Sequence, residues 1–158
     1  ALNAKAGYLP RMIYFAFLSE APGIENLLAE YLCVVFERRC AQDADRAALQ
    51  RKLSGWARAV EKEKTQLENS LLFVSAGRKT PECHITPKYN VLPLLSRHFR
   101  TRYGNSPWMI VDRKRNYGLY GENGKVSLVQ KGWERMRNVP VNPRAAGQTE
   151  RQLIRPAI

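Results

Sequence analysis

The segment that decides the fold class is residues 108–129, which read WMIVDRKRNYGLYGENGKVSLV. Apolar runs at 108–111 and 117–120 predict two strands that are joined by a polar turn. The pair Asn123-Gly124 is a strong signal for a β-hairpin, so a third strand is expected to follow it. The C-terminal half is therefore expected to contain a small antiparallel sheet.

The residues that lead up to this segment predict two more strands and a helix. Short apolar runs at 71–74 and 83–86 have the length and the flanking turn residues of strands. Between the second run and residue 108, apolar residues from Val91 to Phe99 recur with helical spacing. We therefore expect one helix to be inserted among the strands.

The N-terminal half has helical periodicity instead. Apolar side chains recur at three- and four-residue steps in residues 12–18 and 24–36, with a break at Pro22-Gly23. A third helix is predicted to begin at Asp43 or Asp45. Its expected apolar face comprises Leu49, Leu53, Trp56, Val60 and Leu67. The charges on its other face have both signs, which is typical of a solvated surface.

These patterns together predict an α+β fold, with N-terminal helices followed by a small antiparallel sheet with one inserted helix. Residues 1–137 are expected to form a single domain. Residues 138–158 are rich in proline and arginine and lack clear periodicity, so they are expected to be a loosely ordered basic tail.

Composition narrows the compartment and the class of protein. No stretch has the roughly 18 apolar residues needed to cross a bilayer, so no membrane partner is expected. The three cysteines are Cys33, Cys40 and Cys83, and no Cys-x-x-Cys occurs. Their number and spacing indicate neither a disulfide framework nor a zinc site, and they favour the cytoplasm. Cys83-His84 could supply two ligands, but the sequence favours no metal and no cofactor.

Charge points to a polyanionic partner. The chain has 26 Lys and Arg against 14 Asp and Glu, a net charge of +12. A domain this basic attracts phosphates, through long-range steering and through release of counterions. Cations and aromatic residues are interleaved between residues 84 and 120, which suits binding of phosphates and stacking on bases. The predicted nucleic-acid-binding residues are Lys88, Arg97, Arg100, Arg102, Trp108, Arg113, Lys114, Arg115 and Tyr117.

The sequence offers little for catalysis. It contains no Gly-x-Ser-x-Gly elbow, no P-loop and no dinucleotide-binding pattern. His98 and Asp112 are the candidate acid and base. However, a histidine on the apolar face of a helix is more often structural, and Asp112 is followed by three cations that it can orient. The sequence therefore favours a chain without catalytic activity of its own.

Two blocks of sequence resemble a bacterial family called probable DNA metabolism protein. The first block is residues 13–28, IYFAFLSEAPGIENLL, and the second is residues 90–99, NVLPLLSRHF, with Arg102-Tyr103 and then WMIVDRKR at 108–115. Both blocks lie in the family's order, and the resemblance covers residues 11–120. It implies that this chain corresponds to the C-terminal part of a longer family member.

The resemblance also implies a biological context, because the family is typically encoded beside a radical-SAM protein thought to repair or modify DNA. Some members are joined to a uracil-DNA-glycosylase-like domain. The leading hypothesis is therefore an accessory DNA-binding module of a bacterial DNA repair or modification system. The alternatives are a nucleic-acid-processing enzyme domain that uses His98 and Asp112, and a docking module for the radical-SAM enzyme.

Overall fold

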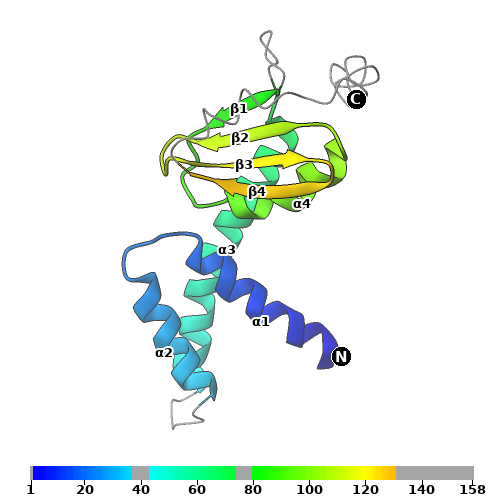
Figure 1. Cartoon of the computed structure of the whole chain (residues 1–158). Coiled ribbons are helices and arrows are strands. Elements are labelled where there is room, and N and C mark those ends of the chain that lie inside the picture. The colour runs from blue at the N-terminus through cyan, green and yellow to red at the C-terminus, as the bar shows by residue number, and fades with distance from the viewer. Residues whose placement is uncertain (1, 37–42, 74–79, 131–158) are drawn as a thin grey trace. The chain divides into compact units, whose positions relative to one another are not determined.

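The computed structural model describes residues 2–36, 43–73 and 80–130. Within these ranges the chain forms helices and one four-stranded sheet, which confirms the predicted α+β class (Figure 1). The helices are α1 (Leu2–Phe17), α2 (Ile24–Phe36), α3 (Asp43–Ser70) and α4 (Leu92–Tyr103). The strands are β1 (Glu82–Ile85), β2 (Trp108–Asp112), β3 (Tyr117–Glu122) and β4 (Lys125–Val129). The predicted tail, residues 138–158, lies outside the described residues.

The chain divides into two compact units whose segments alternate along the sequence. The helical unit comprises Ala1–Ser70 and Pro87–Leu94, and the sheet unit comprises Leu71–Thr86 and Leu95–Ile158. Residues 87–94 thus belong to the helical unit although they lie between two segments of the sheet unit. The single domain expected for residues 1–137 stays a prediction.

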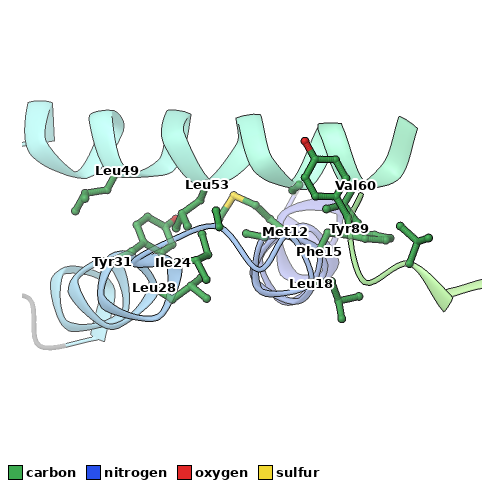
Figure 2. Packing of buried hydrophobic residues seen from close by; sticks show 14 residues of the cluster. Met12, Phe15, Leu18, Ile24, Leu28, Tyr31, Leu49, Leu53, Val60 and Tyr89 are labelled. Atoms are coloured by element: carbon green, nitrogen blue, oxygen red, sulfur yellow. The ribbon is translucent and has the colours of Figure 1, made fainter. Parts of the chain in front are cut away.

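The helical unit is built around one apolar cluster, in which the stripes predicted for α1, α2 and α3 meet (Figure 2). Met12, Phe15 and Leu18 belong to this cluster together with Ile24 and Tyr31 of α2. The side of α3 that faces them presents Leu49, Leu53, Ala57 and Val60, all buried. Burial of each large side chain contributes about 1.5–3 kcal/mol to folding, so this cluster is the main source of stability for the unit.

One residue of the predicted α3 stripe lies elsewhere. Trp56 was expected on the apolar face, but 36% of its surface is exposed. The buried stripe of α3 runs through Leu53, Ala57 and Val60. Trp56 precedes Ala57 and is turned about 100° around the helix from it, at the edge of the buried stripe.

Residues 87–94 are held in the helical unit by polar contacts as well as by burial. Glu63 on α3 accepts hydrogen bonds from the backbone N–H groups of Lys88 and Tyr89, at 2.7 and 2.9 Å. The N–H of Asn90 donates to the carbonyl of Leu18 at 2.9 Å. Tyr89 itself is buried in the apolar cluster of the unit (Figure 2). This segment is thus an integral part of the helical core.

The sheet has the order β1-β2-β3-β4 and is mixed rather than wholly antiparallel. β2 pairs with β3, and β3 with β4, in the predicted antiparallel sense. β1 pairs with β2 in parallel, with Cys83 opposite Ile110. β1 is parallel to β2 because α4 follows β1 in the sequence and returns the chain to the end of the sheet at which β1 began, as a parallel pair requires.

The sequence signals for β3 and β4 are confirmed. Asn123 and Gly124 have φ angles of 50° and 71°, as a two-residue turn of the hairpin type requires. The predicted strand at 71–74 is wrong for residues 71–73, which form no strand, while Val74 lies outside the described residues. Phe73 instead packs edge-on against Phe99 and Trp108, with ring centroids 5.5 and 6.4 Å away.

The apolar layer between α4 and the sheet depends on a glycine. Trp108 is 1% exposed, and its indole ring lies over Gly121, its partner on β3. Phe99 of α4 packs against the same indole, with centroids 5.9 Å apart. A side chain at position 121 would occupy the volume of the indole. The close approach of Trp108 to β3 therefore requires glycine there.

A search of the described helices found none with the length and apolar character that a bilayer-spanning segment needs.

Candidate nucleic-acid-binding surface

The turn between β2 and β3 is organised by a buried carboxylate. Asp112, the last residue of β2, is 0% exposed. Its Oδ1 accepts hydrogen bonds from the backbone N–H groups of Lys114 and Arg115, at 2.8 and 3.1 Å. Its Oδ2 accepts a hydrogen bond from Nη1 of Arg115 at 2.9 Å. One side chain thus fixes the backbone of the turn and one arginine within it.

The backbone around this carboxylate is fixed in two further ways. The N–H of Arg113 donates to the carbonyl of Ile85 at 2.9 Å, so the start of the turn is bonded to the end of β1. Asn116 adopts a φ of 56°, and asparagine tolerates this left-handed conformation better than most residues. The turn is therefore a defined structural element between two paired strands.

The three cations of the turn have different environments. Arg113 and Lys114 are exposed, whereas the side chain of Arg115 is 11% exposed and forms an ion pair with Asp112. Sequence analysis treated all three as phosphate ligands. The structure gives Arg115 a positioning role, because its guanidinium is already bound to Asp112. Arg113 and Lys114 are the side chains of the turn that a phosphate can reach.

The helix α4 adds three more exposed cations to the sheet unit. Leu95 and Phe99 are buried, and Arg97, Arg100 and Arg102 are exposed. Since α4 joins two parallel strands, it runs antiparallel to them. Arg97, Arg100 and Arg102 are thus carried by a helix that packs against the sheet through Phe99 and Trp108.

The two aromatic candidates differ in accessibility. The indole of Trp108 is buried in the layer between α4 and the sheet, so it cannot stack on a base. Trp108 instead packs against Phe99 in the apolar layer beneath the sheet. Tyr117 begins β3 opposite Asp112 and is partly exposed. Its part in binding stays a prediction.

Lys88 belongs to the helical unit, unlike the other predicted ligands. It is exposed, and its Nζ lies 5.2 Å from the ring centroid of Tyr89. Its membership of the same binding surface stays a prediction.

The environment of Asp112 does not suit the acid/base role that the enzyme alternative gives to His98 and Asp112. Both of its oxygens accept hydrogen bonds within the turn, and the residue is inaccessible to solvent. A general base must reach the proton that it removes. His98 packs edge-on against Phe99, with centroids 4.9 Å apart, and its Nε2 is buried. These contacts agree with a structural histidine.

Cys83 and His84 cannot act as a pair of adjacent metal ligands. They are neighbours on β1, and successive side chains of a strand point to opposite faces. Within the ranges that the structure describes, no group of three or more His, Cys, Asp or Glu residues is arranged to hold a metal ion.

Sequence analysis missed a polar group on the sheet face to which His84 belongs. The carboxylate of Glu82 is 4% exposed, and its Oε2 lies 3.4 Å from Nε2 of His84. Tyr120 on β3 shares this face, because Glu82 and Tyr120 are both opposite Met109. The alternation of side chains along β1 was the signal that could have grouped Glu82 with His84.

Tyr120 gives this face a measurable pH dependence. Burial, together with the nearby Glu122 carboxylate, raises its pKa from 10.0 to about 12. The folded state therefore holds the phenolic proton more tightly than the unfolded state. This stabilisation is complete below pH 10.0 and is lost as the pH rises through about 12. Urea unfolding across that interval should show the loss, and Tyr120→Phe should reduce it. An unchanged pH profile in Tyr120→Phe would contradict the assignment.

The chain thus has an α+β fold with a basic turn that a buried aspartate holds. A family model for a domain of unknown function, DUF4130, matches residues 22–153. Because the match spans most of the chain, the chain belongs to the DUF4130 domain family. No curated protein and no solved structure shows a significant match. The family description names no activity.

Proposed function

We propose that this chain is an accessory DNA-binding module that holds the phosphate backbone with the exposed cations of its sheet unit. The resemblance to the bacterial DNA metabolism family supports a place in a DNA repair or modification system. In that system a radical-SAM protein or a uracil-DNA-glycosylase-like protein would act on the DNA that this module holds. No catalytic step is assigned to the module itself.

The single observation that supports this proposal best is the contact between Asp112 and the turn. Arg113 and Lys114 project from a backbone that Asp112 fixes through two N–H groups. A fixed backbone lowers the conformational entropy that is lost when these side chains bind a phosphate. The same carboxylate also binds the guanidinium of Arg115, and charge-assisted hydrogen bonds of this kind hold the turn in one conformation.

Among the described residues, the placement of the exposed cations favours binding through the backbone of DNA. Five exposed cations of the sheet unit lie in the β2–β3 turn and on α4, and contacts of this kind position a protein on DNA without reading sequence. Arg97, Arg100, Arg102, Arg113 and Lys114 are the five exposed cations concerned. We therefore expect weak sequence preference and strong dependence on salt.

The salt dependence can be calculated. Each phosphate that is neutralised contributes about −0.9 to the slope of log affinity against log salt, so five contacts give a slope of about −4.5. Affinity should then fall about 500-fold between about 50 and about 200 mM salt. Fluorescence anisotropy with a short labelled duplex measures this slope. If no binding is detected at the lowest salt, the proposal is wrong.

A matched pair of lysine variants tests the position of the surface. Lys114 precedes β3 and Lys125 follows it, and both are exposed. Lys114→Gln and Lys125→Gln thus change the net charge equally at opposite ends of the same strand. We expect Lys114→Gln to make the slope less steep by about 0.9 and Lys125→Gln to leave it unchanged. Equal effects would show attraction to net charge alone and would exclude a defined surface at the turn.

A further inference from the structure

The outer face of α3 carries several exposed cations. Arg51, Lys52, Arg58 and Lys62 are all exposed, and we call them the α3 cationic face. Arg51, Arg58 and Lys62 are spaced by seven and four residues, so they form one row along the helix. The row is about 16 Å long at about 1.5 Å per residue. Asp45 is an exposed acid, but it lies in the first turn of α3, before this face begins.

The three glutamates of α3 do not neutralise this face, because each has a contact elsewhere. Glu61 forms an ion pair with Arg11 of α1. Glu63 accepts hydrogen bonds from the backbone N–H groups of Lys88 and Tyr89. Glu68 forms an ion pair with Lys64 at 2.7 Å. Sequence analysis described the charges of this helix as mixed. The structure separates them: the three glutamates have intramolecular partners, and the outer face keeps its cations.

The chemistry of the face selects a nucleic acid over an acidic protein. Between its cations the face presents Gly55, and beyond them Gln66 and Asn69, all exposed. Trp56 is the one large apolar residue exposed on α3 within the described residues, and it borders the face. Protein interfaces usually have an apolar or aromatic core, which a row of cations does not supply. Binding to a phosphate backbone needs no such core, because counterion release drives it.

We propose that the α3 cationic face is a second phosphate-binding surface, located on the helical unit, for the same class of ligand. A duplex presents about nine phosphate charges over about 16 Å of its axis, which is ample for four cations. This inference rests on the proposed function for the choice of DNA as ligand. The α3 cationic face shares no residue with the surface at the β2–β3 turn, since none of its residues belongs to the sheet unit. The chain then contacts DNA through both of its units.

The test uses the full chain and the same labelled duplex. In the triple variant Arg51→Gln/Arg58→Gln/Lys62→Gln, the salt slope should become less steep by about 2 to 3. The single variant Lys62→Gln should change the slope by about 0.9, against no change for the matched Lys125→Gln. Circular dichroism should show native folding throughout, because substitutions at exposed positions seldom affect stability by more than about 0.5 kcal/mol.

Variants of the two surfaces separate the two proposals. If Arg113→Gln/Lys114→Gln changes the slope and the α3 triple variant does not, the second surface is excluded and the proposed function stands. If only the α3 triple variant changes the slope, the α3 surface stands and the turn is excluded. If the α3 triple variant binds DNA normally but loses binding to poly-glutamate, the ligand is an acidic protein and the α3 proposal is overturned.

Discussion

Gly121→Ala is expected to destabilise the sheet unit by about 3 kcal/mol, at the upper end of the range for overpacked cores. The new Cβ would overlap Cε2, Nε1 and Cζ2 of Trp108. That indole cannot move aside easily, because it is 1% exposed and packs against Phe99 and Phe73. The measurement is the free energy of unfolding in urea, followed by tryptophan fluorescence and by circular dichroism.

The matched control is Gly55→Ala on α3. A Cβ at position 55 would have no atom within 4 Å, and the residue lies inside an exposed helix face. Alanine has a higher helix propensity than glycine, so this variant should be more stable by about 1 kcal/mol. The same substitution is therefore expected to have opposite signs at the two positions. If Gly121→Ala is as stable as the parent, the packing of Trp108 described above is wrong.

Asp112→Ala is the second variant with a large expected effect. It removes the acceptor of two backbone N–H groups and leaves the Arg115 guanidinium, 11% exposed, without its carboxylate. Removing one partner of a buried ion pair typically costs about 3–5 kcal/mol. Glu61→Ala is the control, since Glu61 is paired with Arg11 at the surface, where an ion pair contributes about 0–1 kcal/mol. Equal losses in the two variants would contradict the organising role of Asp112.

Asp112→Asn connects this stability effect to DNA binding. The amide oxygen can still accept the N–H groups of Lys114 and Arg115, but the amide nitrogen would face Nη1 of Arg115, donor to donor. The turn is then retained while its arginine is released. We expect weaker DNA binding than in the parent, although the net charge becomes more positive. Tighter binding would show that the turn is only part of a diffuse basic surface.

The elements that sequence predicted well are those with local signals. Asn123-Gly124 requires a particular turn, and the apolar run of β2 is bounded by turn residues on both sides. The spacing of Leu95 and Phe99 likewise identified α4. In each case the residues that determine the element are neighbours in sequence. Such signals are available without knowledge of the tertiary structure.

The misses have non-local causes. An apolar run such as residues 71–73 has the same pattern whether it pairs as a strand or packs as Phe73 does, against α4 and β2. The direction of β1 depends on a neighbour that is more than twenty residues away. Trp56 lies at the edge of a helical stripe, where a small change in helix packing decides its exposure.

The candidate site was predicted by residue type, and the structure revises the role of its members. A run such as Asp112-Arg113-Lys114-Arg115 indicates charge, but not which members are buried. The separation of Arg115 from the two exposed cations follows from the position of Asp112 at the end of a central strand. In the same way, the cationic face of α3 emerged only when the partners of Glu61 and Glu63 were known.

The alternation of the two units along the chain constrains how the gene could be divided. Tyr89 and Val91 complete the helical core, yet they are encoded after β1, which belongs to the other unit. A break after residue 70 would leave the first fragment without these side chains. Glu63 would also lose the two backbone hydrogen bonds that it accepts from Lys88 and Tyr89. Recombination at that point would separate residues that fold together. The helical unit is therefore expected to need residues 87–94 to fold, so a cut after residue 70 should not yield two independent domains.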